Sequence, residues 1–456
     1  MALAAAIFRQ YDIRGVVDKD LTTDAARAVG SAYAALLREC GLHGAVAVGR
    51  DNRPSGDALR DALVDGLTTA GVDVIDIGVV PTPLTYWALH HLPVVGGIQV
   101  TGSHNPPEYN GFKLSVEKGS VHGEEIQHLY TLAQQARPAA PTRGTIRHTQ
   151  VIDGYIDDVV RRVGKLSRPI RAVYDCGNGA GALVAPQLFE RLGLVGRGLF
   201  CESDGTFPNH HPDPTVPENL EALIAAVRTD GAEIGIAFDG DADRIGVVDG
   251  KGNIIWGDRI LILYARDVLE RTGRGQPIIF DVKCSQSLPT AIENAGGQPI
   301  MWKTGHSLIK EKMRETNAPI AGEMSGHMFF SEGFYGHDDA MYGAARLLRI
   351  LADSGRTVDE LLADVPDFVS TPELRIDVPE ELKFGLVEAA VRHFRARYDV
   401  IDVDGVRVLF GDGWGLIRAS NTQPVIVARY EAATPERLAA IRGEMEGWLR
   451  AQGVTV

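Results

Sequence analysis

The sequence predicts an α/β protein made of three related α/β domains, with mixed, mainly parallel sheets, and a C-terminal α+β domain. Two observations carry this prediction. A short apolar strand, a polar loop, a helix and a second strand after a glycine follow one another three times along the chain. Strands that alternate with helices in this way are typical of parallel sheets. From about residue 365 the pattern changes to long strand-like runs and one final helix, which is typical of an α+β unit.

The three copies begin with AVAVGRDNRPSG, RAVYDCGNGAG and PIIFDVKCSQS, and their second strands lie in VDVIDIG, LVGRGLF and GQPIMW. Residues 131–145 are rich in Ala, Pro and polar residues, which is typical of a connection between two domains. We therefore expect domains at residues 1–146, 147–250, 251–364 and 365–456. On the pattern alone, one larger α/β domain that holds all three copies is nearly as well supported.

Composition and charge exclude several classes of partner. The chain has 456 residues, of which 45% are hydrophobic and 23% charged, as in an ordinary globular protein. A net charge of -14 argues against a nucleic-acid or anionic-membrane partner, and no run reaches the roughly 18 apolar residues of a membrane span. The four cysteines form no CxxC pair, which suits a reducing cytosol and gives no sign of a disulfide framework. We expect a cytoplasmic protein without a signal peptide, most simply a monomer, with a dimer as the alternative.

Three aspartates lie two residues apart between apolar strands in IGIAFDGDADRIGVVDG: Asp239, Asp241 and Asp243. Carboxylates this close repel one another, and a divalent cation relieves the repulsion. An EF-hand is excluded, because it would need Gly in place of Arg244 and Glu in place of Gly250. A phosphatase-type nucleophile would need Thr or Val at Asp243. A solvated acidic turn is less favoured than a Mg2+ site, and Arg244 adds a cation that can hold a phosphate.

A small-residue turn, VTGSHNP, follows the strand-like run GGIQV and presents Ser103 beside His104. A neighbouring histidine can activate a serine nucleophile. Gly, Ser, Asn and Pro are also ordinary turn residues. This short stretch therefore leaves a catalytic serine and a plain loop both open.

The loop DCGNGAGA matches the G-x-G-x-x-G/A fingerprint of dinucleotide-binding domains at Gly177, Gly179 and Ala182. Glu202 or Asp204 lies near the position where that fingerprint requires an acidic residue. The same glycines can simply let a strand turn tightly into a helix. A lone match is weak, and we favour the structural role.

Two further loops gather polar groups, which suit a polyhydroxyl ligand in the first loop and a phosphate in the second. In AGEMSGHMFF, Glu323, Ser325 and His327 alternate, so an extended backbone would point them to one side. IRASNTQP places four polar residues after an apolar strand: Arg418, Ser420, Asn421 and Thr422. Such a turn can cradle a phosphate with side chains and backbone N–H groups. Taken alone, the first loop is better explained as a polar strand edge, and a capped turn explains the second loop equally well.

Further cationic and aromatic residues lie in strand-like segments. They are Lys113 in NGFKL, Lys283 in DVKCS, and Tyr11 and Arg14 in YDIRG. Each alone is more often a surface residue than a site residue. Together they supply the local positive charge that an anionic ligand needs in a chain of net negative charge.

Five of these motifs, taken in order, resemble one family. YDIRG, TGSHNP, DGDADR, GEMSGH and RASNTQP resemble the α-D-phosphohexomutases, and most closely the bacterial phosphomannomutase/phosphoglucomutase group. The resemblance runs from Tyr11 to Thr422, nearly the whole chain. It implies three related α/β domains and a fourth α+β domain around a central cleft.

The resemblance also implies an activity and its cofactors. It implies a mutase that interconverts hexose 1-phosphate and hexose 6-phosphate, for mannose and/or glucose. The family carries the serine of TGSHNP as phosphoserine, which implies that Ser103 donates and accepts the phosphoryl group. Mg2+ would bind Asp239, Asp241, Asp243 and an oxygen of the phosphate on Ser103. A hexose 1,6-bisphosphate would be the intermediate and the activator.

The same resemblance implies roles for the remaining residues. The loop RASNTQP would hold the phosphate that is not reacting, and Glu323 and Ser325 would hold sugar hydroxyls. Other residues would line the cleft: Tyr11, Arg14, Lys113, Arg244, Lys283, His306 and His327. Lys113 and His327 are the candidates for the general acid or base, and Arg14 is grouped with them at the reacting centre. His104 is a polar neighbour of Ser103.

Three alternatives stay open beside this hypothesis. Phosphoglucosamine mutases typically have GEQSGH and RxSGTEP, from which Met324 and the run Asn421-Thr422-Gln423 depart. Nothing in GEMSGH separates glucose from mannose, so we expect dual specificity. A sugar-phosphate-binding paralogue without turnover would be expected to lack Ser103 or an aspartate of the loop. A metal-dependent phosphohydrolase would release phosphate steadily.

Overall fold

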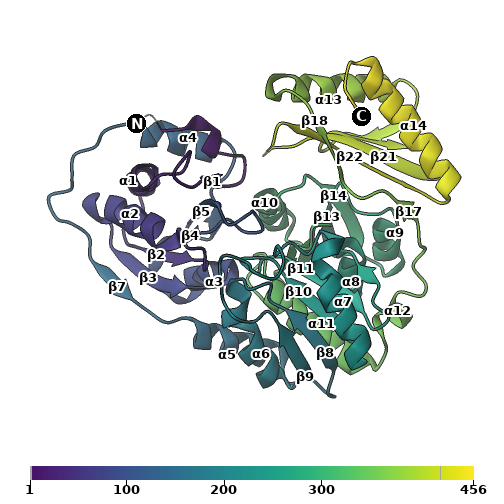
Figure 1. The fold of residues 1–456 in the computed structure, drawn as a ribbon, viewed down its shortest axis with the longest axis horizontal. Coiled ribbons are helices and arrows are strands. Elements are labelled where there is room, and N and C mark those ends of the chain that lie inside the picture. Colours follow the sequence, from purple (N-terminus) through teal and green to yellow (C-terminus); the bar gives the residue numbers. More distant parts are fainter. Residues whose placement is uncertain (1–2, 422) are drawn as a thin grey trace.

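Four β-sheets follow one another along the chain in the computed structural model, which describes residues 3–421 and 423–456. Each sheet forms a unit with the helices beside it. Figure 1 shows the units in an arc, from the first at the left to the fourth at the upper right. The first three sheets are mixed and the fourth is antiparallel. The predicted class, three α/β units and an α+β unit, is confirmed.

The first unit has the sheet order β1-β5-β4-β2-β3-β7, with β6 paired to β5. Its strands are β1 (Ile13–Val16), β2 (Ala45–Arg50), β3 (Val74–Val79), β4 (Val94–Val100), β5 (Tyr109–Val116), β6 (Gly119–Ser120) and β7 (Ile146–His148). Its helices are η1 (Ala5–Ile7), α1 (Thr23–Glu39), α2 (Gly56–Thr69), α3 (Thr82–His91) and α4 (Glu124–Ala133).

The second unit has the order β12-β11-β10-β8-β9. Its elements are α5 (Ile152–Val163), β8 (Arg171–Asp175), η2 (Ala180–Leu183), α6 (Ala185–Leu192), β9 (Val195–Leu199), η3 (Pro217–Leu220), α7 (Glu221–Asp230), β10 (Ile234–Phe238), β11 (Ile245–Asp249) and β12 (Ile254–Ile255).

The third unit has the order β14-β13-β15-β16. Its elements are α8 (Gly257–Thr272), β13 (Pro277–Asp281), α9 (Ser287–Asn294), β14 (Gln298–Trp302), α10 (His306–Thr316), β15 (Ile320–Gly322), β16 (Met328–Phe330), α11 (Ala340–Ser354) and α12 (Val358–Leu361).

A set of four strands recurs in the first three sheets, in the orders β3-β2-β4-β5, β9-β8-β10-β11 and β14-β13-β15-β16. In each set the first three strands are parallel, and the fourth is antiparallel to the third. The three copies in the sequence are therefore three copies of one topology. Each copy has a turn between its third and fourth strands, and all three turns carry predicted site residues.

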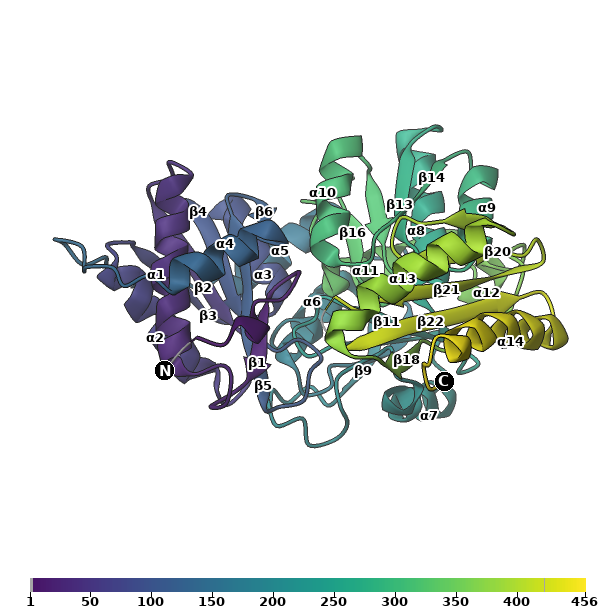
Figure 2. The ribbon, with the colours of Figure 1, turned by 90° about the horizontal axis from the view of Figure 1, so that it is seen from above.

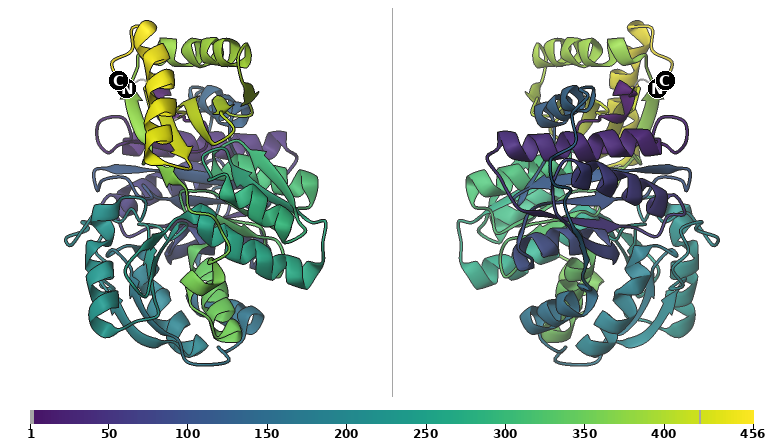
Figure 3. Two further views of the ribbon diagram at one scale, coloured as in Figure 1. Left: turned by 90° about the vertical axis from the view of Figure 1, so that its right-hand side faces the viewer. Right: turned by 90° about the vertical axis from the view of Figure 1, so that its left-hand side faces the viewer.

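The fourth unit is an antiparallel sheet in the order β17-β22-β21-β20-β19, with β18 also paired to β22. Its strands are β17 (Val369–Ser370), β18 (Leu374–Asp377), β19 (Asp399–Ile401), β20 (Val406–Leu409), β21 (Gly413–Ala419) and β22 (Val425–Ala432). The helices α13 (Glu380–Arg395) and α14 (Pro435–Ala451) cover its outer face (Figure 3).

The first three units share one apolar core, whereas the fourth unit has its own. Strand β2 shows why, because its apolar residues alternate between two faces. Val46 and Val48 pack in the core beneath α1 and α2, and Ala45 and Ala47 face a second core. That second core continues through the second and third units. From above, the first unit lies on one side and the third and fourth units on the other (Figure 2).

Within residues 3–421 and 423–456, no helix combines the length and apolar character that crossing a bilayer demands. This agrees with the absence of long apolar runs in the sequence.

Candidate active site

The turns between the third and fourth strands of the repeated set meet at one place. Ser103 lies in the turn β4–β5, Asp239 follows β10, and Glu323 follows β15. An isolated bridge joins Arg244 to His327, so the second and third turns lie directly side by side. Because the three units share a core, the repeat brings one chemically different loop from each unit to a common centre.

The Ser103 turn has a fixed and unusual backbone. Ser103 is buried and has φ = 50°, a left-handed conformation that residues other than glycine adopt rarely. Its N–H donates to Thr101 Oγ1 at 2.8 Å, and its Oγ donates to Asp239 Oδ2 at 3.0 Å. The Nδ1 atom of His104 lies 3.1 Å from the same Oγ. Strained backbone of this kind often holds a reacting group in place.

Arg53 anchors this turn, and the sequence analysis missed it. The guanidinium is fully buried and pairs with Asp51. Its terminal nitrogens donate to four backbone carbonyls of the turn, those of Ser103, Asn105, Pro106 and Tyr109. Asp51 in turn accepts hydrogen bonds from Thr101 and from the N–H of Gly102. One buried cation therefore holds the carbonyl groups of the Ser103 turn from within.

The aspartate loop is fixed by its own backbone. Asp239 Oδ1 accepts hydrogen bonds from the N–H groups of Asp243 and Arg244, both at 3.1 Å. Ala242 adopts a left-handed φ of 56°, which lets the chain turn back between β10 and β11. From the first unit, Thr82 donates its N–H to the carbonyl of Asp241 at 3.0 Å. The loop is thus tied both to itself and to a neighbouring unit.

The three aspartates fit a divalent cation. Asp239, Asp241 and Asp243 are fully buried, and each offers an oxygen within 4.8 Å of the others. The Oδ1 atom of Asp241 is buried without a hydrogen-bond partner, and that of Asp243 meets the ring of His327 at 3.2 Å. Burial and the charges of Asp243 and Asp241 raise the pKa of Asp239 well above its usual value. A divalent cation that prefers oxygen ligands would bind the unsatisfied oxygen and reduce the repulsion between the carboxylates.

Lys113 lies against the same loop. Its Nζ donates to Asp241 Oδ2 at 2.8 Å and forms a shorter contact with Asp243 Oδ2. Burial lowers the pKa of Lys113, but these two carboxylates outweigh burial and raise it above its usual value. Burial raises the pKa of Asp243, but Lys113 and His327 outweigh it and hold that pKa well below its usual value. Lys113 is therefore charged as the site stands.

His327 connects the aspartate loop with the loop GEMSGH. Its Nε2 lies 3.2 Å from Asp243 Oδ1, and its Nδ1 lies 2.8 Å from Glu323 Oε2 and 3.2 Å from Ser325 Oγ. Burial lowers the pKa of His327, but Asp243 and Glu323 together outweigh burial, and the pKa is about 9. Glu323 Oε1 accepts the N–H of Gly305 at 2.6 Å. Both oxygens of Glu323 therefore already have protein partners.

The fourth unit reaches the site through Asn421 and Tyr11. Asn421 Nδ2 donates to Tyr11 Oη at 2.6 Å, and Tyr11 Oη donates to the carbonyl of Thr304 at 2.7 Å. Burial is the main cause that raises the pKa of Tyr11 to about 12. The Tyr11 and His306 rings lie edge to face, with centroids 6.4 Å apart. These contacts join the first, third and fourth units at one point.

Three of the predicted cations are each paired with a carboxylate outside the aspartate loop. Arg418 Nε donates to Asp404 Oδ2 at 3.0 Å, and Lys283 Nζ donates to Glu373 Oε2 at 3.1 Å. Arg14 pairs with Asp12 and donates to Asn105 Oδ1 of the serine turn at 2.6 Å. The Lys283 cation is the main cause that lowers the pKa of Glu373, to about 2. Glu373 and Asp404 are site residues that the sequence analysis missed.

The phosphate-binding loop predicted in RASNTQP is described except at one position. Ser420 is buried, its Oγ accepts the N–H of Gln423 at 3.2 Å, and its carbonyl accepts Lys383 Nζ at 2.6 Å. Thr422 lies outside the described residues. Lys383 is a buried cation of α13 that binds backbone carbonyls of the loop. The sequence did not predict this contact, because Lys383 lies in an ordinary helical segment.

The glycine-rich loop DCGNGAGA serves packing. Gly177 has φ = 51°, and a Cβ on Gly179 would lie 2.7 Å from the carbonyl oxygen of Gly240. The N–H of Ala180 donates to that carbonyl at 2.9 Å. The close approach that these glycines permit is to the aspartate loop, which supports their structural role over a dinucleotide site.

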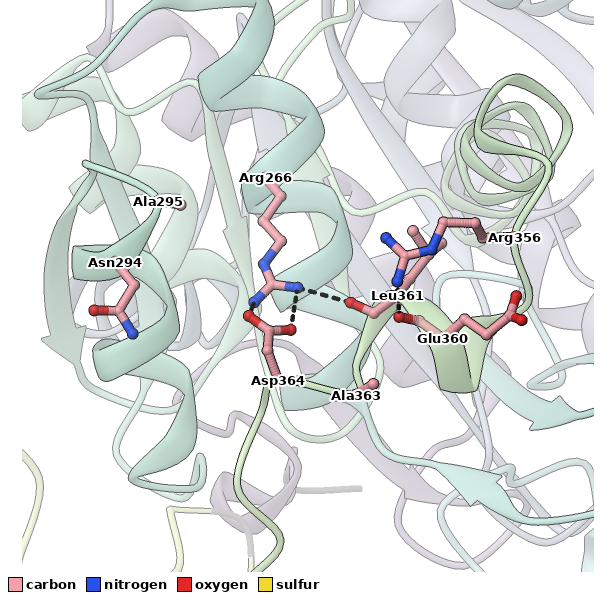
Figure 4. A pocket seen from close by; sticks show the side chains of 8 residues that line it. All are labelled: Arg266, Asn294, Ala295, Arg356, Glu360, Leu361, Ala363 and Asp364. Carbon is pink, nitrogen blue, oxygen red and sulfur yellow. Dashed lines mark hydrogen bonds and ion pairs between the residues drawn. The ribbon is translucent and has the colours of Figure 1, made fainter.

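A separate hollow of about 550 Å3 lies on the third unit between α8, α9 and α12 (Figure 4). Within it, Arg266 pairs with Asp364 at 2.7 Å and donates to the carbonyl of Leu361, and Arg356 bonds to the carbonyl of Glu360. Its cations are engaged with the protein, and none of the predicted site residues lines it.

The phosphoglucomutase/phosphomannomutase family matches this chain along almost its whole length. Alpha/beta/alpha domain I matches residues 5–139, domain II residues 153–252, domain III residues 256–368, and the C-terminal domain residues 373–447.

Characterised relatives and a solved structure give the same result. The chain is 48% identical over 442 residues to a phosphomannomutase/phosphoglucomutase of Pseudomonas putida, covering 97% of this chain and 95% of the relative. It is 47% identical over 444 residues to a phosphoglucomutase of Neisseria gonorrhoeae, covering 96% of both. The crystal structure of a phosphoglucomutase/phosphomannomutase family protein of Burkholderia thailandensis has a TM-score of 0.91 at 45% identity, covering 99% of this chain and 98% of that one.

Proposed function

This chain belongs to the phosphoglucomutase/phosphomannomutase family and is a sugar-phosphate mutase, and we propose that it moves the phosphoryl group through Ser103. The substrates are hexose 1-phosphates and 6-phosphates of glucose and mannose. The observation that carries the proposal is the hydrogen bond of 3.0 Å between Ser103 Oγ and Asp239, because it sets a serine against a cluster of three buried carboxylates. A serine in a fixed turn beside a cation site suits phosphoryl transfer, which depends mainly on positioning and charge neutralisation.

The transfer consists of two exchanges that balance. The bond between Ser103 Oγ and phosphorus breaks while a bond forms between that phosphorus and the free hydroxyl of the sugar monophosphate, whose proton passes to a base. The product is a hexose 1,6-bisphosphate. After the sugar reverses its orientation, its other phosphate returns to Ser103 Oγ, and a proton passes back to the sugar oxygen that is released. Externally supplied bisphosphate serves as the activator by the same exchange.

Asp239, Asp241 and Asp243 would hold Mg2+, together with an oxygen of the phosphate on Ser103. The cation would neutralise charge on the transferring group. Lys113 and His327 are the candidates for moving the proton, because both contact the aspartate loop. Arg14, which contacts Asn105 of the serine turn, would stabilise the transferring phosphoryl group.

The remaining residues would bind the substrate. Glu323 and Ser325 would hold sugar hydroxyls, and the loop of Arg418, Ser420, Asn421 and Thr422 would hold the phosphate that is not reacting. Further contacts would come from Tyr11, Arg244, Lys283 and His306. Since Arg418 is paired with Asp404 and Lys283 with Glu373, a phosphate would compete with or join these ion pairs. We expect the enzyme to act in the cytoplasm as a monomer.

A coupled mutase assay on three substrates tests the proposal. Glucose 1-phosphate and mannose 1-phosphate should be converted with comparable kcat/KM when catalytic bisphosphate is present, and glucosamine 1-phosphate should be much poorer. A clear preference for glucosamine 1-phosphate would identify a phosphoglucosamine mutase. Steady release of inorganic phosphate from the sugar would identify a phosphohydrolase, and binding without either product would identify a non-catalytic paralogue.

A further inference from the structure

Two of the four cysteines lie in contact, although 25 positions separate them in the sequence. The Sγ atoms of Cys176 and Cys201 are 2.8 Å apart. All four cysteines are free thiols in the structure. Cys40 is exposed at the end of α1, and Cys284 is buried with its thiol donating to Asp281 Oδ1 at 3.0 Å. Only the pair formed by Cys176 and Cys201 is a contact between thiols among the described residues.

The contact follows from the topology of the second unit. Cys176 comes directly after β8, and Cys201 comes two residues after β9, its parallel neighbour. Backbone hydrogen bonds continue past both strand ends, from the N–H of Cys176 to Leu199 and from the N–H of Asn178 to Phe200. The register that pairs Asp175 with Leu199 leaves the two cysteines offset by one residue on adjacent, hydrogen-bonded segments. Their Sγ atoms already meet, so a disulfide needs only a small further approach of the two side chains.

We propose that Cys176 and Cys201 are a modification site, a dithiol that a peroxide converts reversibly into an intramolecular disulfide. The Cys201 thiol releases its proton, the thiolate attacks one oxygen of hydrogen peroxide and the O–O bond breaks. The leaving hydroxide takes up the released proton, so that a sulfenic acid and one water form. The Cys176 thiol then attacks the sulfenic sulfur, the S–O bond breaks, and a second water leaves. Two thiols lose two electrons and two protons, and one peroxide molecule accepts them. A small dithiol or thioredoxin-type reductant reverses the reaction.

The two cysteines differ in a way that sets the order of these steps. Cys201 is partly exposed, so peroxide can reach it, whereas Cys176 is fully buried. Burial raises the pKa of the Cys176 thiol, which makes it a poor first nucleophile. Contact with Cys201 places it to resolve a sulfenic acid there before further oxidation. The arrangement is an accessible thiol backed by a resolving thiol.

The bond would form one turn away from the aspartate loop. The carbonyl of Cys176 accepts the N–H of Gly179, and the next residue, Ala180, donates to the carbonyl of Gly240. On the other side, Asn178 Nδ2 donates to the carbonyl of Glu202 at 2.8 Å. A disulfide would therefore lock the loop that contacts the aspartate loop to the neighbouring loop after β9. Formation of this disulfide does not depend on the proposed function of the protein.

Peptide mapping after peroxide treatment tests the proposal. The reduced full-length protein is treated with hydrogen peroxide, blocked with N-ethylmaleimide under denaturing conditions, digested without reductant and analysed by mass spectrometry. We expect a linked peptide that contains Cys176 and Cys201 and lacks two hydrogens, while Cys284 carries the maleimide. Dithiothreitol should restore four free thiols in total, the number in the sequence.

Three cysteine variants provide controls for this experiment on the unmodified sequence. Cys201→Ser should abolish the linked peptide and leave Cys176 alkylated, and the matched control Cys284→Ser should leave the linked peptide unchanged. Cys40→Ser serves as the background that prevents links between chains. The proposal is wrong if Cys176 and Cys201 of the unmodified sequence both carry maleimide at peroxide doses that oxidise Cys40. It is equally wrong if Cys201 accumulates as a sulfinic acid with Cys176 still free.

Discussion

The aspartate loop (residues 239–244) and the loop RASNTQP (residues 418–424) are both turns between antiparallel strands, but the protein holds them very differently. Asp239, Asp241 and Asp243 are fully buried, and residues of the first and third units contact their loop. The loop RASNTQP contacts another unit through the bond between Asn421 and Tyr11. Within this loop, Gln423 is exposed. The aspartate loop is therefore fixed by several units, whereas the loop RASNTQP is carried by the fourth unit.

The cores of the molecule show the same contrast. One apolar core runs through the first three units, whereas the fourth unit is built around its own. A small apolar cluster of Val282, Trp414 and Leu416 joins the fourth unit to the third. The groups proposed to react therefore lie on units that share one apolar core. The group proposed to hold the phosphate that is not reacting lies on a unit with a separate core. Substitutions in the Ser103 turn or the aspartate loop should therefore mainly lower kcat, whereas substitutions in the loop RASNTQP should mainly weaken substrate binding.

Ser103→Ala should have the largest effect. If the phosphoryl group passes through this oxygen, kcat should fall on the order of a thousandfold or more, as expected when a nucleophile is lost. Thermal unfolding should change little, because the variant removes one oxygen and Arg53 still holds the turn. The control is Ser120→Ala in the same unit, outside the site, which should keep its activity. Full turnover by Ser103→Ala without added bisphosphate would refute the role of this serine.

Removal of the cation should have an effect nearly as large, but a reversible one. Three buried carboxylates, one with an oxygen that lacks a hydrogen-bond partner, would repel an anionic phosphate unless a cation neutralises them. Exhaustive chelation should therefore reduce turnover to about 1% or less, a loss on the scale of ~3 kcal/mol, and Mg2+ should restore it. Asp241→Asn should weaken Mg2+ binding measured by calorimetry. An unchanged rate after complete chelation would contradict the metal assignment.

Arg418→Ala should have an intermediate effect, confined to binding. Loss of a charge-assisted hydrogen bond costs about 1.5–3 kcal/mol, so kcat/KM should fall roughly ten- to hundredfold for glucose 1-phosphate and mannose 1-phosphate alike. The variant should also release more free bisphosphate per turnover. Arg437→Ala, which removes a half-buried arginine of the same unit that pairs with Asp412, is the matched control. If only one sugar is affected, Arg418 recognises the sugar; if neither is affected, the loop is a plain turn.

Asn421→Ala should have the smallest effect and tests the link between the fourth unit and Tyr11. A neutral hydrogen bond contributes about 1 kcal/mol, so we expect a rise in KM of about fivefold with kcat nearly unchanged. Tyr11→Phe should do the same. If the two residues act through their mutual bond, the double variant should be no worse than either single one. Additive losses would show that each residue contacts the substrate separately.

The fold could be predicted because its signals are local. Alternating strands and helices, with glycines and prolines at turns, gave the three copies and the change to an α+β unit. The loops of Ser103, Asp239 and Glu323 were predicted as site loops, and the structure brings them together. The topology explains why, since each occupies the same position in a repeated set of four strands. That equivalence could not be seen in the sequence, because the copies differ in their residues.

What could not be predicted depends on contacts between distant segments. Arg53 lies in a loop that looks like an ordinary turn, yet it bonds carbonyls 50 to 56 positions away. Asp404 and Glu373 matter because each neutralises a predicted cation. The pair of Cys176 and Cys201 was hidden for the same reason, since the spacing of cysteines in the sequence does not show that their strands are neighbours. Residue type and local pattern identify candidate site residues, but the side chains that they contact across the fold determine their roles.

The most direct test of the central claim, that chemistry resides at Ser103 and phosphate binding at Arg418, is phosphopeptide mapping of two proteins. The unmodified enzyme and Arg418→Ala are each incubated with a saturating concentration of glucose 1,6-bisphosphate, freed of ligand, digested and analysed by mass spectrometry. The account predicts one phosphoryl group in each protein, on Ser103, which leaves when hexose monophosphate is added. An active enzyme without phosphate on Ser103, or with phosphate on another residue, would contradict it.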